Sequence, residues 1–169
     1  MMVPTSTRGL ARRTSKLFVL ASLAGPMALS SFGCSVGGPA NCSTNQVSQV
    51  EEGRDMAPGD NCITCHAGTE APVYAIAGTV MGAYRDDTNC DGVGNTTVEI
   101  TDANGVVTTI PTTSAGNFYS HKHVATPYNA RVVRNGKIRA MATAQTDTNC
   151  ANCHTAQGMN NAPGRIVAP

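Results

Sequence analysis

The sequence predicts a mainly β protein, an antiparallel β-sandwich flanked by short, loop-rich segments. Two Asn-Gly pairs, at 104–105 and 135–136, are strong signals for tight hairpin turns. No stretch shows a long helical periodicity. Short runs rich in β-branched and alternating residues recur through the middle of the chain, at 73–81, 96–102, 106–110, 118–124, 130–134 and 137–143.

The first 33 residues have the layout of a signal peptide. Four basic residues precede an apolar run at 17–29, which is shorter than the ~20 residues of a membrane-spanning helix and is interrupted by Pro26. We expect cleavage before Cys34. A cysteine directly after the cut is how bacterial lipoproteins begin, which makes Cys34 a lipidation candidate; an ordinary secreted start is the alternative.

Residues 34–55 are small and polar and predict a flexible tether. Removing residues 1–33 takes away four of the 12 basic residues and none of the 11 acidic ones, so the remaining chain is mildly acidic. No basic cluster remains, and nucleic acid is not indicated as a partner. Membrane contact is expected only through a lipid on Cys34. Five aromatic residues remain, which is little large apolar surface for a domain of this length.

Two C-x-x-C-H motifs bracket the predicted strands. A redox dithiol needs alternating strands and helices, which are absent here, and zinc knuckles are usually ~15–20 residues apart. Neither explains the repeated histidine. Covalent haem explains every position, because two cysteines three apart bond the two vinyl groups and the next histidine ligates the iron. The expected thioether residues are Cys62, Cys65, Cys150 and Cys153, and the expected proximal ligands are His66 and His154.

We therefore predict two haem c groups in a di-haem domain at 56–169. The flanking haem-binding segments are 56–72 and 141–169, and the β-sandwich is 73–140. Only 15 residues follow His154, too few for the helices that usually close over a haem. We expect the sandwich or the first haem segment to cover the second haem, so that the two haems lie together at one end of the β domain.

Two cysteines outside the motifs, Cys42 and Cys90, could form a disulfide in an exported protein. The stretch from Asp87 to Gly92 copies the start of a calcium loop, but the position that needs a glutamate holds Val98. A solvated turn is the simpler interpretation of that stretch.

The sequence offers four candidates for the distal ligands of the two irons. Met141 ranks first and Met56 second, since each precedes a C-x-x-C-H motif and supplies a soft sulfur that raises the reduction potential relative to histidine. His121 and His123 are the alternatives; two apart in a predicted strand, they would lie on one face.

The segment AGTVMG and the longer segment TTVEITDANGVVTTIPTTSAGNFYS resemble the carboxypeptidase regulatory-like (transthyretin-like) β-sandwich. The whole chain resembles small secreted di-haem cytochromes in which this sandwich lies between two haem motifs. That resemblance rests on MAPGDNCITCH and on MATAQTDTNCANCHTAQGMNNAPGRI. It implies that Met56 and Met141 match recurring methionines, and that residues 164–166 match a recurring tail.

These features predict an electron carrier outside the cytoplasmic membrane, in the periplasm or at the outer membrane or cell surface. Two six-coordinate haems leave no open iron site, so the expected partners are redox proteins and catalysis is not expected. One alternative is a small haem enzyme, a peroxidase or a reductase, with one open iron and His121 or His123 as acid–base residue. Another is a structural β-sandwich in which haem serves as a staple.

Overall fold

The computed structural model describes residues 53–68, 71–85 and 91–169, which all belong to the unit formed by residues 33–169. The predicted signal peptide, Cys34, Cys42 and Cys90 lie outside the described residues, as does most of the stretch from Asp87 to Gly92. Among the residues that are described, no helix is long and apolar enough to cross a membrane.

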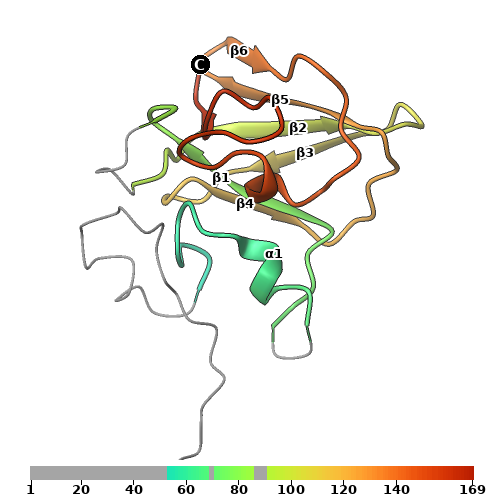
Figure 1. The fold of residues 1–169 in the computed structure, drawn as a ribbon, viewed down its shortest axis with the longest axis horizontal. Coiled ribbons are helices and arrows are strands. Elements are labelled where there is room, and N and C mark those ends of the chain that lie inside the picture. Colours follow the sequence, from blue (N-terminus) through green and yellow to red (C-terminus); the bar gives the residue numbers. More distant parts are fainter. Residues whose placement is uncertain (1–52, 69–70, 86–90) are drawn as a thin grey trace, which may run out of the picture. The chain divides into compact units, whose positions relative to one another are not determined.

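The described chain is mainly β and forms two sheets, which confirms the predicted sandwich class (Figure 1). The three-stranded sheet has the order β4-β1-β7, with β1 at Ile76–Met81, β4 at Asn117–Ser120 and β7 at Ile166–Val167. The four-stranded sheet has the order β3-β2-β5-β6, with β2 at Thr97–Thr101, β3 at Val107–Pro111, β5 at Asn129–Arg134 and β6 at Lys137–Ala140. All pairs are antiparallel except β1 with β7, which is parallel.

The hydrophobic core is contributed by both sheets. In β2 the alternating pattern puts Val98 and Ile100 inward, at 2% and 1% exposure. From the other sheet, Phe118 of β4 and two residues of β1 join the same cluster. Its members are Ile76, Val80, Val98, Ile100, Ile110, Phe118, Val124, Tyr128 and Val132. This lean core is built mostly from Val and Ile, as the composition indicates.

Both predicted Asn-Gly turns connect neighbouring antiparallel strands. Asn135 and Gly136, between β5 and β6, have φ of 51° and 75°, the pair of positive values that a two-residue hairpin turn needs. Between β2 and β3, the Asp102 carboxylate accepts bonds from the backbone N–H groups of Asn104 and Val106, each at 2.9 Å. Turn chemistry therefore fixes the register of the larger sheet.

Two elements differ from the sequence-based expectation. The run predicted at 118–124 is a strand only to Ser120, so His121 and His123 do not share a strand face. Near the C-terminus, the tail was expected to be loop, but β7 pairs with β1 through Val80 with Ile166 and Met81 with Val167. A two-residue strand has too short a pattern to be visible in sequence, because tertiary contacts decide its conformation.

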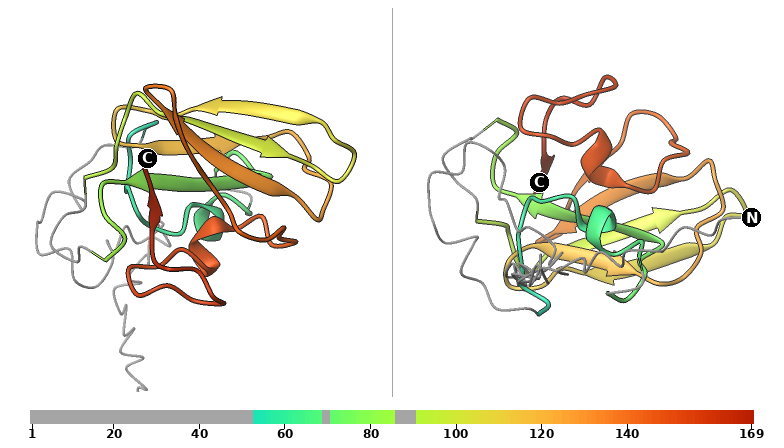
Figure 2. Two further views of the ribbon diagram at one scale, coloured as in Figure 1. Left: turned by 90° about the horizontal axis from the view of Figure 1, so that it is seen from above. Right: turned by 60° about the horizontal axis from the view of Figure 1, so that its bottom comes forward.

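Strand β1 is the element on which the rest of the site depends. All six of its residues are buried, whereas β2 is buried only at alternate residues. Ile76 and Val80 belong to the core cluster, and the segments that carry the two C-x-x-C-H motifs also contact β1. Figure 2 shows these two segments, each with one short helical turn, on the β1 side of the sandwich.

Candidate functional site

Each C-x-x-C-H motif forms a single helical turn. The first motif is α1 (Cys62–Cys65), and the second contains the 3-10 turn η2 (Cys150–Asn152). In both, the histidine backbone N–H donates to the carbonyl of the first cysteine, at 2.9 Å. This shared turn brings both cysteines and the histidine of a motif close together, as attachment along one edge of a macrocycle requires.

The four motif cysteines are in no disulfide and are partly exposed. Burial raises the pKa of the Cys62 thiol, and burial followed by the nearby Cys62 raises the pKa of Cys150 to about 12. Reactive redox dithiols need the reverse, a pKa lowered by positive charge or a helix N-terminus. The surroundings of Cys62 and Cys150 therefore do not favour a thioredoxin-like function.

The His66 ring is clamped by the segment 72–74. Its Nδ1 lies 2.8 Å from the carbonyl oxygen of Pro72, and since a carbonyl only accepts, Nδ1 carries the proton. The Nε2 lone pair is then left for a metal. The Tyr74 ring stacks on His66 at 4.0 Å between centroids and 14° between planes, and the Tyr74 N–H donates to the His66 carbonyl at 3.0 Å. The clamp fixes both the tautomer and the plane of the imidazole.

The same arrangement recurs at the second motif. The Nδ1 of His154 lies 2.9 Å from the carbonyl oxygen of Gly164, so its Nε2 is also left as the free nitrogen. Gly164 has a φ of 147°, and a Cβ at this position would lie 2.4 Å from the Tyr84 carbonyl oxygen. Only glycine fits there. The tail at 164–166 thus positions the His154 ring before it enters β7.

The two motifs lie side by side although they are 88 residues apart. The Asn149 Nδ2 donates to the Asn61 Oδ1 at 2.9 Å, and each asparagine directly precedes the first cysteine of its motif. Asn61 also caps α1, accepting from the Thr64 N–H at 3.2 Å. The Asn61 Nδ2 lies 3.5 Å from the Asn152 Oδ1. Hydrogen bonds between side chains thus join the two seats directly.

Strand β1 and its partner β4 hold the first motif. The Thr79 hydroxyl donates to the Asn117 Oδ1 at 2.8 Å and accepts from the Gly59 N–H at 2.9 Å. The Asn117 Nδ2 donates in turn to the Met56 carbonyl at 2.8 Å. Because Thr79 and Asn117 are buried, these bonds also satisfy their polar groups.

The second motif lies against the same strand. Asn149 forms a bridge with Ala77 in the parallel sense. Next to it, a Cβ on Gly78 would lie 3.1 Å from the Cys150 Cβ and 3.0 Å from the Phe118 ring, so the absence of a side chain at Gly78 allows this approach. On the other side, the buried Tyr128 hydroxyl donates to the Asp147 carbonyl at 2.8 Å and holds the segment before the motif.

A cavity of about 200 Å³ opens beside the first motif. Met56 lines it together with Cys62, Cys65, His66, Tyr74, Phe118 and Tyr119. The residues fit a covalently attached haem: two thiols in no disulfide, an imidazole with its Nε2 left free, a thioether and aromatic walls. Since ligand sites are usually ~300–1,000 Å³, a macrocycle here would be only partly enclosed, with an edge open to solvent.

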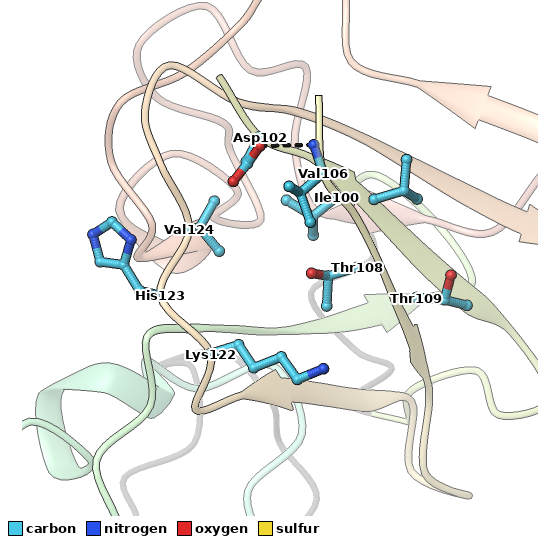
Figure 3. A pocket seen from close by; sticks show the side chains of 9 residues that line it. Ile100, Asp102, Val106, Thr108, Thr109, Lys122, His123 and Val124 are labelled. Atoms are coloured by element: carbon cyan, nitrogen blue, oxygen red, sulfur yellow. Dashed lines mark hydrogen bonds between the residues drawn. The ribbon is translucent and has the colours of Figure 1, made fainter. Parts of the chain in front are cut away.

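The remaining distal candidates are separated in space. Met141 is partly buried and packs on the core cluster, as does Cys150 of the second motif. His121 is exposed; its Nδ1 lies 2.7 Å from the Val73 carbonyl oxygen, and its ring meets Tyr74 edge-on at 5.2 Å. His123 instead lines another cavity of about 400 Å³, between the loop at 122–124 and the β2–β3 hairpin (Figure 3).

Sequence reasoning missed Tyr74 and Tyr119. Their rings stack at 4.4 Å between centroids and 14° between planes, which extends the stack on His66 to three rings. A weak signal exists, because these two residues are among the five aromatics outside the signal peptide. Nothing in the sequence shows that they meet, since Tyr74 precedes β1 and Tyr119 lies on β4.

Within residues 53–68, 71–85 and 91–169, no three His, Cys, Asp or Glu side chains gather in a way that could hold a metal ion. The six motif residues thus do not form one zinc-type cluster. No family model, curated protein or solved structure matches the chain. The resemblances described from the sequence are therefore carried by its motifs alone.

Proposed function

We propose that the chain is a di-haem c-type cytochrome that carries electrons outside the cytoplasmic membrane. One observation carries the proposal: each motif presents two cysteines and a histidine on one turn, with the histidine Nδ1 facing a backbone carbonyl. A carbonyl at Nδ1 keeps the imidazole neutral and leaves Nε2 as the metal ligand. Haem attached at these positions would supply a reversible one-electron couple.

In this proposal the chain's own residues bind and orient the cofactors. Cys62, Cys65, Cys150 and Cys153 form the thioether bonds, and His66 and His154 are the proximal ligands. Met56 is the distal candidate for the first haem, because it lines the cavity that His66 also lines. Met141 stays the candidate for the second, with His121 and His123 as alternatives.

The location and the partners rest on the sequence. A signal peptide at 1–33 would deliver the chain to the compartment where c-type haem is attached, and a lipid on Cys34 would retain it at a membrane. An edge of the first cavity open to solvent suits exchange with redox partner proteins.

Intact mass of the full chain, produced in a host competent for c-type maturation, tests the proposal. We expect the mass of two haems above the mature polypeptide. The double variant Cys62→Ala/Cys65→Ala should lose one haem, and Cys150→Ala/Cys153→Ala the other. A wild-type protein without added mass, or one that carries zinc on these cysteines, would overturn the proposal.

Binding of carbon monoxide to the reduced protein separates the carrier from the enzyme alternative. Two six-coordinate irons should leave the spectrum unchanged when carbon monoxide is added. Rapid binding at one iron would reveal an open site and favour the small haem enzyme. A redox titration separates the carrier from the structural staple, since a carrier must be reduced and reoxidised reversibly.

A further inference from the structure

The most direct connection between the two motifs is the hydrogen bond from Asn149 to Asn61. It joins the N-cap residues of two turns that each carry a cysteine as their first residue. A thiol, and any group bonded to it, is therefore attached one residue away from this contact on both sides. The Coulomb effect of Cys62 on the pKa of Cys150 also shows that the two first cysteines are neighbours.

The Asn149 side chain is unusual among its neighbours. Its Oδ1 is buried and is the one such side-chain atom without a hydrogen-bond partner in the part of the chain that the structure describes. An unsatisfied buried oxygen is costly, and an apolar residue of similar size would avoid that cost. The useful end of the side chain is therefore the Nδ2, and the one bond it makes is to Asn61.

The clasp is also braced from outside. The Asp147 carboxylate accepts from the Asn149 N–H at 2.9 Å and from the Asn152 Nδ2 at 2.8 Å. On the other side, the Asn61 Oδ1 is fixed by its cap bond to Thr64. Since β1 supports both segments, the two turns cannot move apart without breaking buried contacts.

We propose that the Asn61–Asn149 pair is a positioning clasp that fixes the distance and angle between the two haem seats and so couples their reduction. This inference rests on the proposed di-haem function. An electron held at one seat changes the energy of adding an electron at the other, through a Coulomb interaction that falls with distance. A rigid clasp makes this interaction constant, whereas loose turns would average it.

Two substitutions at Asn61 separate the clasp from the helix cap. Asn61→Ser keeps a side-chain oxygen that can cap α1 but is too short to reach Asn149. Asn61→Asp keeps both the cap and the acceptor for the Asn149 Nδ2, and serves as the matched control. Because Asn61→Asp adds a charge that shifts absolute potentials, the comparison uses quantities that do not depend on a common shift.

The measurements use the haem-loaded full chain. Two haems held rigidly at close range should give a two-signed circular dichroism couplet in the Soret band and two separated reduction potentials. We expect Asn61→Ser to bind both haems but to lose most of the couplet amplitude and narrow the separation. Asn61→Asp should keep both. In haem-free protein, Asn61→Ser and Asn149→Ala should be non-additive in unfolding free energy, which a double-mutant cycle measures.

A haem-loaded Asn61→Ser protein with the wild-type couplet and separation would overturn the clasp, as would an equal loss in both variants. Additive effects in the cycle would overturn it as well. These results would leave the di-haem proposal intact. A wild-type protein without haem would overturn both proposals, and this outcome is distinguished by the mass measurement on the unmodified sequence.

Discussion

Replacing Gly78 by alanine tests whether β1 seats the second motif. A Cβ at this position would lie 3.0 Å from Phe118 Cζ and 3.1 Å from Cys150 Cβ, whereas ordinary contacts begin at 3.4 Å. One neighbour must therefore retreat by about 0.3–0.4 Å. Phe118 is 2% exposed and is the register partner of Gly78, so the turn that carries Cys150 is the more movable of the two.

Overpacking of this kind typically costs about 1–3 kcal/mol. At about 4 °C per kcal/mol for a domain of this size, Gly78→Ala should lower Tm by roughly 4–12 °C. The second haem should be disturbed more than the first, because Cys150 belongs to its seat. Gly82→Ala is the matched control, since its Cβ would meet only a Val93 methyl at 3.9 Å.

The assay is thermal unfolding followed by circular dichroism, together with haem content measured separately for the two motifs by proteolysis and mass spectrometry. Gly82→Ala should stay within about 0.5 kcal/mol of wild type. Equal Tm values for the two glycine variants, with full occupancy of the second motif in both, would refute the packing argument for Gly78.

Three further substitutions test other contacts of the site. Gly164→Ala should move the potential of the second haem alone, because it displaces the carbonyl that faces His154 Nδ1; a redox titration that shows both potentials unchanged would contradict this. Tyr74→Leu should lower the unfolding free energy by about 0.5–1.5 kcal/mol beyond its burial by removing the stack on His66, while Tyr74→Phe should keep the stack; denaturant titration of both variants checks it. Hydrogen bonds, first from the Ser114 hydroxyl, lower the pKa of Asp55 from 3.8 to about 2, so its stabilising effect is present above pH 3.8 and is lost as pH falls towards 2. Wild type should therefore lose its stability advantage over Asp55→Asn in that interval, and a constant difference between the two would show that the carboxylate does not titrate as proposed.

The strands were predictable because their signals are local. Alternation marks β2, and the Asn-Gly pair at 135–136 has the positive φ values that only a few residue types accept readily. The motifs were equally visible, since C-x-x-C-H is contiguous. The end of β4 was not, because His121 and His123 alternate with other residues as a strand would, yet the chain leaves the sheet after Ser120.

The relation between the motifs was out of reach of sequence reasoning in detail. The expectation that they lie at one end of the domain did not identify Asn61 and Asn149 as the contact, since an asparagine before a cysteine reads as a helix cap in each motif separately. The Pro72 and Gly164 carbonyls are equally silent, because a backbone oxygen has no residue-type signature. Such partners become visible only in three dimensions.

The parallel pairing of β1 with β7 has a consequence for the order in which the molecule assembles. The β2–β3 and β5–β6 hairpins join neighbouring residues, but β1 and β7 come from opposite ends of the described region. Closing so long a loop is slow, because its entropy is recovered only when the last contacts form. We therefore expect Cys150 and Cys153 to stay reachable by a ligating enzyme after the larger sheet has folded, so that maturation of this seat can finish last without unfolding what is already built.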